Sequence, residues 1–123
     1  MSEVIIKIAD QPVTSGRMVK VVTIIGVLDE SNADEKADII YDMIASLQQG
    51  AVVIFDLKDL NFMNSKSVGY LTDWYLKIVD EKGGALVLTQ TKSGLLDILD
   101  TVGLLQIIRN YSTMDEAIKF ASS

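Results

Sequence analysis

Along the chain, short apolar runs alternate with segments in which apolar residues recur every three or four positions. Short runs rich in β-branched side chains are typical of strands, whereas the wider spacing is typical of helices with one buried face. Five runs fit the strand pattern, at residues 4–9, 18–28, 51–57, 85–89 and 106–109. Because the run at 51–57 is almost wholly apolar, it predicts a strand covered on both faces, as in a parallel sheet.

Four further segments have helical spacing, and each begins at a residue that can cap a helix. The candidate first residues are Ser31 or Asn32, Asn64 or Ser65, Ser93, and Ser112. Ser31 and Asn32 are each followed three positions later by an acidic residue, which is a capping-box pattern. The expected buried faces are Ala37, Ile40, Ile44 and Leu47; then Val68, Leu71, Tyr75, Ile78 and Val79; then Leu95, Leu96, Leu99 and Val102; and finally Ala117, Ile118 and Ala121.

These elements follow one another in the order β-β-α-β-α-β-α-β-α. Strands that alternate with helices predict right-handed crossovers and a mostly parallel sheet. The polar segment 10–17, which contains Pro12, predicts a turn, so the first two strands should pair antiparallel at one end. We therefore expect a single α/β domain over residues 1–123, with a mostly parallel mixed sheet of about five strands and four helices distributed unequally on its faces.

Composition then narrows the chemistry that the chain can perform. Its 123 residues include no cysteine and no histidine, and the formal net charge is −6. These absences exclude disulfides, thiolate nucleophiles and imidazole bases, and the negative charge disfavours binding to nucleic acid or anionic membranes. No apolar run approaches the roughly 20 residues that cross a bilayer, and the first residues lack the basic start of a signal peptide. A cytoplasmic protein without a metal or cofactor is expected.

An enzyme hypothesis would have to depend on carboxylates such as Asp29 and Asp56, as in a carboxylate-based hydrolase. The chain has no glycine-rich phosphate loop of the G-x-x-x-x-G-K type and no nucleophile elbow. The composition and motifs therefore favour a binding module over an enzyme.

Three segments stand out together. Gly26-Val27-Leu28-Asp29 ends a strand just before a capped helix, residues 56–65 (DLKDLNFMNS) lead into the second helix, and residues 95–105 (LLDILDTVGLL) form a helix followed by Val-Gly-Leu. In this order and spacing they resemble the STAS family, the fold of bacterial anti-sigma factor antagonists, over almost the whole chain. The middle segment is the most specific of the three.

The resemblance implies a partner-switching cycle. In that family an unphosphorylated antagonist binds a serine kinase-type anti-sigma factor and thereby frees a sigma factor. The kinase then phosphorylates a serine or threonine at the start of the second helix, binding is lost, and a phosphatase of the PP2C type resets the cycle. By its position in the motif, the acceptor in this chain is Ser65.

Two residues beside Ser65 depart from the family's pattern. The family usually has a carboxylate before the acceptor, where this chain has Asn64, and often a glycine or other small residue two positions after it, where this chain has Ser67. These departures keep a second hypothesis open. In it, the chain is a STAS scaffold or a subunit of a signalling or lipid-transport complex that binds its partner constitutively, with the switch lost or altered.

Elementary electrostatics gives a phosphate on Ser65 two different effects. A helix N-terminus has free N–H groups and a partial positive charge, so the domain itself would be stabilised by ~0.3–1 kcal/mol. In an interface the same phosphate is desolvated, and an unpaired buried charge weakens binding by about 2–5 kcal/mol. The alternative is that Ser65 is an N-cap that only closes the helix.

The face of the second helix that points away from its expected buried stripe is the predicted binding surface. Lys66 and Tyr70 lie on it, and Trp74 follows Tyr70 by four positions, so the two rings should form one patch. Trp74 has an alternative in which it leans onto a neighbouring helix and completes the core. Asp29, in a loop beside the strand ends, is either a partner contact or a solvated or helix-capping residue. The predicted partner-binding residues are Asp29, Asn64, Lys66, Ser67, Tyr70 and Trp74.

Overall fold

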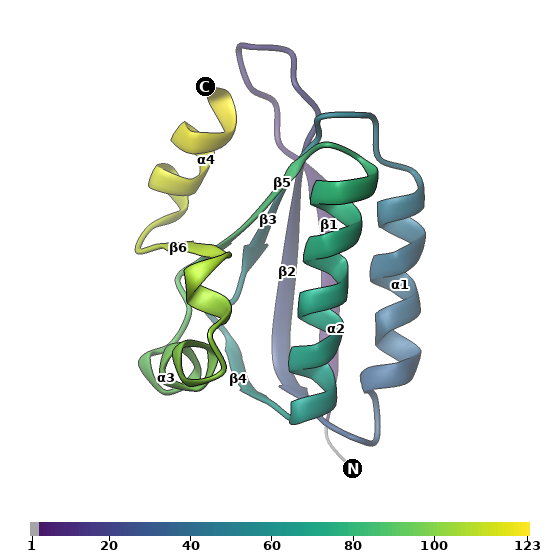
Figure 1. Cartoon of the computed structure of the whole chain (residues 1–123), viewed down its shortest axis with the longest axis vertical. Coiled ribbons are helices and arrows are strands. Elements are labelled where there is room, and N and C mark those ends of the chain that lie inside the picture. The colour runs from purple at the N-terminus through teal and green to yellow at the C-terminus, as the bar shows by residue number, and fades with distance from the viewer. Residues whose placement is uncertain (1–2) are drawn as a thin grey trace.

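A computed structural model describes residues 3–123, which form a six-stranded mixed sheet with helices on both faces (Figure 1). The strands are β1 (Val4–Asp10), β2 (Val19–Leu28), β3 (Val52–Asp56), β4 (Leu60–Met63), β5 (Ala85–Thr89) and β6 (Arg109–Tyr111). The helices are α1 (Ala33–Ala45), α2 (Ser65–Leu76), α3 (Ser93–Thr101) and α4 (Met114–Ser122). A π-helical turn, Lys77–Glu81, follows α2 directly, and a 3-10 turn, Leu104–Gln106, follows α3.

The sheet has the strand order β1-β2-β3-β5-β6, with β4 pairing beside β2. β1 is antiparallel to β2 across the turn that contains Pro12, and all other pairs are parallel. The ten residues of β2 allow it to pair with β3 along its first half and with β4 along its second half. The expected antiparallel addition to a mostly parallel sheet is confirmed.

The two faces of the sheet are covered unequally, as the sequence predicted. Helices α1, α2 and α3 bury one large core against the sheet, whereas α4 packs on the other face over β3 and β5 (Figure 1). β3 runs between the two cores, so Val53 and Phe55 face one while Val52 and Ile54 face the other, all of them fully buried. This double coverage explains why the segment at 51–57 shows no polar alternation.

Two strand predictions need correction. Residues 60–63 form a sixth strand, β4, which is not among the five predicted strands, so the order becomes β-β-α-β-β-α-β-α-β-α. Only Leu60 and Met63 of these four residues are buried, and the pairing with β2 rather than a local apolar pattern makes them a strand. The last strand lies at 109–111 instead of 106–109, because Leu104 fills the core from a 3-10 turn and delays the strand.

Gly26 allows β2 to change partners. The pairing of β2 with β4 shifts register between Gly26 and Val27, and Gly26 has a φ of +111°. A Cβ at this position would lie 2.3 Å from the carbonyl oxygen of Glu3, which no side chain tolerates. Glycine is therefore required where β2 passes close to Glu3 and begins to pair with β4.

Candidate functional site

Ser65 is the first residue of α2, and its side chain is exposed. The residue before it, Asn64, is the N-cap, whose backbone N–H donates to the carbonyl of Leu28 at the end of β2 (3.0 Å). The Asn64 Oδ1 atom accepts hydrogen bonds from the backbone N–H and the hydroxyl of Ser67, at 2.9 and 2.7 Å. Asn64 and not Ser65 therefore closes the helix, so the alternative that Ser65 acts as its N-cap is wrong.

The start of α2 has spare hydrogen-bonding capacity. The Asn64 side chain and carbonyl satisfy the N–H groups of Ser67 and Val68. The N–H groups of Ser65 and Lys66 have no acceptor within residues 3–123. Two free amides at the positive end of a helix are suited to an anion attached at Ser65.

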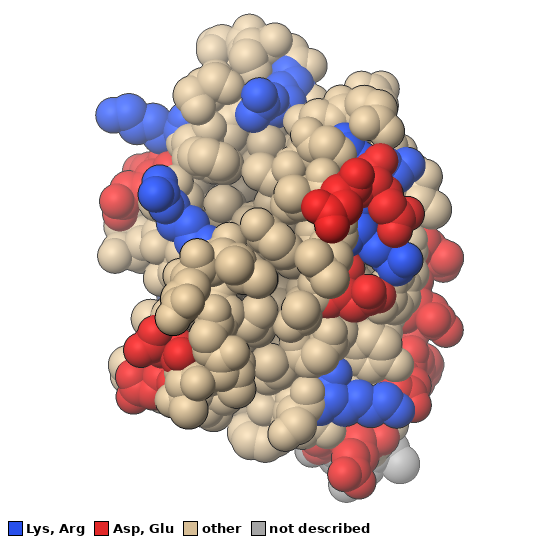
Figure 2. Space-filling view, in the orientation of Figure 1, with Lys and Arg blue, Asp and Glu red and all other residues tan. Residues whose placement is uncertain are grey.

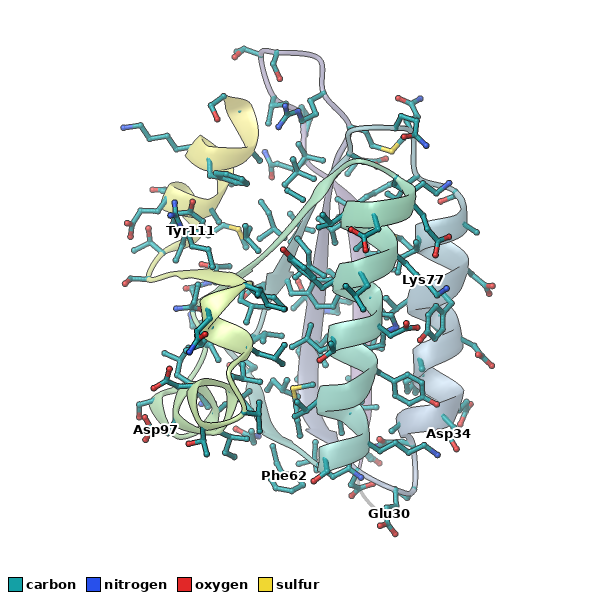
Figure 3. The ribbon with its side chains drawn as sticks, viewed as in Figure 1. Glu30, Asp34, Phe62, Lys77, Asp97 and Tyr111 are labelled. Atoms are coloured by element: carbon teal, nitrogen blue, oxygen red, sulfur yellow. The ribbon has the colours of Figure 1, made fainter. Side chains whose placement is uncertain are left out.

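An open hollow surrounds the Ser65 hydroxyl. It has a volume of ≈ 540 Å³ and is lined by Glu30, Asn64, Ser65 and Lys66. Glu30 comes from the loop between β2 and α1, and Figure 3 shows it beside the first turn of α2, on the opposite side from Phe62. The hydroxyl is consequently accessible from solvent.

Lys66 and Tyr70 fasten α2 to α1 through a shared carboxylate. The ammonium of Lys66 lies 2.7 and 2.9 Å from the two oxygens of Asp34, and the Tyr70 hydroxyl donates to Asp34 at 2.6 Å. The hydrogen bond from Lys66, followed by that from Tyr70, lowers the pKa of Asp34, while the carboxylate raises the pKa of both partners. Acidic side chains gather along α1 (Figure 2), so Lys66 lies beside a negative surface.

The prediction that Trp74 is exposed on the binding surface is wrong, because only 2% of this residue is accessible. Its ring stacks on Phe55 of β3 (5.7 Å between centroids) and on Tyr70 (6.0 Å), and the edge of Tyr41 from α1 packs against it. Tyr41 in turn donates a hydrogen bond to Asp73, and burial followed by this bond raises the pKa of Tyr41. Trp74 and Tyr70 do form one aromatic cluster, but it fills the seam between α1 and α2.

Ser67 is also removed from the predicted contact surface. Only 1% of this residue is exposed, and its hydroxyl is directed to Asn64. The buried residues of α2 are Ser67, Leu71 and Trp74, and Ile78 continues the stripe in the following turn. The helix is therefore rotated relative to the predicted stripe, and Tyr75 and Val79 are only half-buried.

Asp29 organises the loop that precedes α1. Its Oδ1 atom accepts hydrogen bonds from the backbone N–H and the hydroxyl of Ser31, at 2.9 and 2.6 Å. The expected capping box is wrong, because Asn32 makes no side-chain cap and instead bonds the Asp29 amide and the Val27 carbonyl. Asp29 is half-buried, and its hydrogen bonds to Ser31 hold the loop before α1 in place. A contact between Asp29 and a partner protein stays a prediction. Asp56, the last residue of β3, accepts a hydrogen bond from the Lys58 amide at 3.1 Å.

Sequence analysis missed an apolar groove that borders Ser65. The groove has a volume of ≈ 370 Å³ between α2 and α3. Three of its apolar residues are strongly exposed: Phe62 at 44%, Ile98 at 40% and Val102 at 57%. Val102 was expected in the core, but the structure directs it and Ile98 outward. The groove is lined by Phe62, Met63, Asn64, Ser65, Val68, Ile98 and Val102.

The family model described as STAS domain matches residues 11–117, which is most of the chain. The chain belongs to the STAS domain family. None of the curated proteins matches this STAS domain.

Solved structures share the fold at low identity. An anti-sigma factor antagonist from Mycobacterium paratuberculosis superposes with a TM-score of 0.79 at 21% identity, covering 98% of this chain and 96% of that one. The antagonist SpoIIAA in its unphosphorylated form gives 0.69 at 21% identity, with 93% and 95% covered. The phosphorylated form of SpoIIAA from Bacillus gives 0.64 at 21% identity, with 93% and 98% covered.

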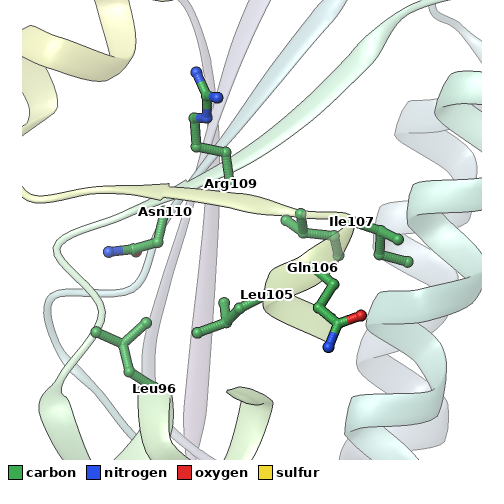
Figure 4. Close-up of a pocket in the computed structure, with 7 residues that line it drawn as sticks. Leu96, Leu105, Gln106, Ile107, Arg109 and Asn110 are labelled. Atoms are coloured by element: carbon green, nitrogen blue, oxygen red, sulfur yellow. The ribbon is translucent and has the colours of Figure 1, made fainter. Parts of the chain in front are cut away.

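A further hollow of this STAS domain offers little chemistry. The one drawn in Figure 4 lies between α3 and β6, has a volume of ≈ 540 Å³ and has Arg109 and Asn110 among its polar residues. Asn110 accepts a hydrogen bond from Thr91, and Arg109 donates to the Tyr111 hydroxyl, so both already serve the fold. In residues 3–123 there is no group of three or more potential metal ligands, and none of their helices is long and apolar enough to cross a membrane.

Proposed function

We propose that this STAS domain is an anti-sigma factor antagonist that binds a serine kinase-type anti-sigma factor while Ser65 is unphosphorylated. Phosphorylation of Ser65 by the kinase releases the complex, and a phosphatase of the PP2C type restores binding. The chain acts as a binding module and not as an enzyme. The observation that carries the proposal is the exposed hydroxyl of Ser65 on the first residue of α2, beside an apolar groove.

The surface around Ser65 has the composition of a docking site. The exposed side chains of Phe62, Ile98 and Val102 supply apolar area on one side. Lys66 and the acidic edge of α1 supply charges on the other. Apolar area bordered by polar and charged side chains is typical of protein–protein interfaces. A partner that fills the groove would cover Ser65 as well, because Ser65 is part of its wall.

A phosphate on Ser65 would leave the fold intact and weaken the binding of the partner. In the free domain it stays in solvent next to two unpaired amides, so the fold is retained. In the complex it would be desolvated between the apolar groove and the acidic α1, with Lys66 already paired to Asp34. An uncompensated charge of this kind weakens binding by about 2–5 kcal/mol, or roughly thirty-fold to several thousand-fold.

The solved relatives support this proposal by analogy. SpoIIAA is described as an anti-sigma factor antagonist and has been solved in both an unphosphorylated and a phosphorylated form. Both forms superpose on this chain over 93% of its length.

The test combines the protein with candidate kinase-type anti-sigma factors from the same genome, ATP and magnesium. Mass spectrometry is expected to find a phosphate on Ser65 and none in the Ser65→Ala variant. In titrations without ATP, Ser65→Ala should bind as the wild type does, whereas Ser65→Asp should bind at least about thirty-fold more weakly. Ser93→Asp is the matched control, because Ser93 is likewise the exposed first residue of a helix, α3.

Each outcome separates the proposal from its rivals. Equal binding by the wild type and Ser65→Asp would instead support a scaffold that holds its partner constitutively. A partner released equally by Ser93→Asp would show a general charge effect. No phosphate on Ser65 and no complex with any candidate kinase would refute the proposal. Groove variants such as Val102→Asp should weaken the complex without changing the fold, because Val102 is exposed.

A further inference from the structure

β1 is an outer strand of the sheet with one free edge. It pairs with β2, and within residues 3–123 no strand covers its other side. The strand is seven residues long, whereas β6 at the opposite edge has three. A free edge of this length presents a row of N–H and C=O groups on which another strand can pair.

The pairing with β2 decides which residues offer these groups. The carbonyl of Glu3 accepts a hydrogen bond from the N–H of Val27 on β2 (3.1 Å). Residues along an antiparallel strand alternate between bonding the partner strand and pointing away from it. Glu3 and the residues two and four positions after it therefore bond β2, and Val4, Ile6 and Ile8 direct their backbone groups to the free edge.

The side chains of β1 alternate in the same way. Val4 and Ile6 pack into the core under α1 and α2, so Glu3, Ile5 and Lys7 lie on the opposite face of the sheet. On that face α4 packs against β3, β5 and β6, and Ile5 remains 52% exposed. An exposed isoleucine is thus flanked on one face by an acid and a base, each two residues away.

A second copy of this chain fits these features in one register. If the two Ile5 residues lie opposite each other in antiparallel strands, Val4 of each copy pairs with Ile6 of the other, and Glu3 pairs with Lys7. The outward backbone groups then bond each other, the Ile5 side chains meet, and two pairs of opposite charges flank them. A register centred on Lys7 would oppose two lysines, and a register centred on Ile6 would place Lys7 opposite Ile5 and leave Glu3 and Lys7 without each other. The register centred on Ile5 is the one of the three that pairs Glu3 with Lys7, so the charges favour it.

We propose that this chain forms a two-fold symmetric dimer by antiparallel pairing of β1 with β1 of a second copy, centred on Ile5. The interface is isologous, because each copy contributes the same strand to it. It joins the two sheets into one continuous sheet. The proposal goes beyond the proposed function and needs neither the phosphorylation of Ser65 nor an anti-sigma factor.

Sedimentation equilibrium of the full chain, without a tag before β1, tests the dimer. The wild type should show a monomer–dimer equilibrium. Glu3→Lys and Lys7→Glu should each associate about tenfold more weakly, because each variant replaces two attractive cross-strand pairs with two repulsive ones. The double variant Glu3→Lys/Lys7→Glu should recover the wild-type constant, since the pairs return with exchanged signs.

An equimolar mixture of the two single variants is the most specific test of the proposed charge pairs. Chains with lysine at both positions complement chains with glutamate at both, so the mixture should form heterodimers although neither variant associates well alone. Lys58→Glu is the matched control, with the same charge change on an exposed loop lysine. Circular dichroism checks that every variant is folded.

Three results would overturn the dimer. The first is a wild type that stays monomeric at millimolar concentration. The second is that Glu3→Lys and Lys7→Glu associate as strongly as Lys58→Glu does. The third is a mixture of the two single variants that associates no more strongly than either variant alone. None of these results involves a partner protein or a phosphate. The dimer and the proposed function can therefore fail separately.

Discussion

Replacing Asn64 with alanine removes the side chain that closes the first turn of α2. In the wild type its Oδ1 atom accepts from the N–H of Ser67 at 2.9 Å and from the Ser67 hydroxyl at 2.7 Å. Ser67 is only 1% exposed, so water cannot readily replace the lost acceptor. The variant therefore loses an N-cap and leaves a buried hydroxyl without a partner.

The magnitude follows from these two losses. An N-cap replaced by alanine costs ~0.5–2 kcal/mol, and an unsatisfied buried hydroxyl adds ~1 kcal/mol or more. The free energy of unfolding should fall by about 2–3 kcal/mol. Asn64→Asp keeps an acceptor and places a negative charge at a helix N-terminus, so it should match or exceed the wild type. In the double variant Asn64→Ala/Ser67→Ala, the loss should be smaller than the sum of the single losses by about 1 kcal/mol.

Urea unfolding followed by the fluorescence of Trp74 measures these changes. Trp74 is the sole tryptophan and is 2% exposed, so unfolding transfers it from the core to water. A loss of this size lowers the midpoint by roughly 1–2 M for a typical urea slope. The control is Asn61→Ala, an exposed asparagine whose change should stay within about 0.5 kcal/mol. Equal losses for Asn64→Ala and Asn61→Ala, or for Asn64→Ala and Asn64→Asp, would refute the reasoning.

Two other changes test Gly26 in β2 and the contact of Asp34 in α1 with Lys66 and Tyr70 in α2. Gly26→Ala forces a Cβ to within 2.3 Å of a backbone oxygen at a φ of +111°, so thermal unfolding should show a loss of about 2 kcal/mol or more. Gly16 has a φ of +77° and open space around it, so Gly16→Ala should lower the stability less. Equal losses of stability in the two variants would contradict the steric explanation for Gly26. Asp34→Asn should change the pH dependence of stability, because Lys66 and Tyr70 lower the pKa of Asp34 in the folded chain. The carboxylate then stabilises the fold above its unfolded pKa of about 3.9, and this contribution is lost as the pH falls through the folded pKa. The urea midpoint of the wild type should exceed that of Asp34→Asn at neutral pH and converge with it in acid, and a constant difference would contradict this.

The order of most elements was predictable because burial leaves a strong mark on sequence. The run at 51–57 has no polar alternation, and β3 is indeed covered on both faces. β4 could not be found in this way, because Asn61 and Phe62 in its middle are exposed. Its strand geometry comes from pairing with the far half of β2, a contact between residues more than thirty positions apart.

The candidate site was predicted in part, and its errors share one cause. Hydrophobicity favours Tyr75 and Val79 over Ser67 for the buried stripe, yet the helix buries the serine. Ser67 can be buried because the Asn64 side chain accepts a hydrogen bond from its hydroxyl, and the hydrophobic periodicity of the sequence does not report that bond. Trp74 turned inward with the same rotation, and the groove on α3 was missed because apolar residues such as Val102 were assumed to be core.

The rotation of α2 also determines what Ser65 is free to do. Successive residues of a helix are about 100° apart, so a helix that buries Ser67 turns Ser65 roughly 200° away, toward solvent. Burial of Leu71 and Trp74 on the same stripe holds this orientation with much more energy than the first turn alone could supply. Asn64 supplies the N-cap, so the Ser65 hydroxyl is not needed to close the helix. The asparagine that departs from the family pattern thus performs a separate task from its neighbour, with one residue closing the helix and the next left available for modification.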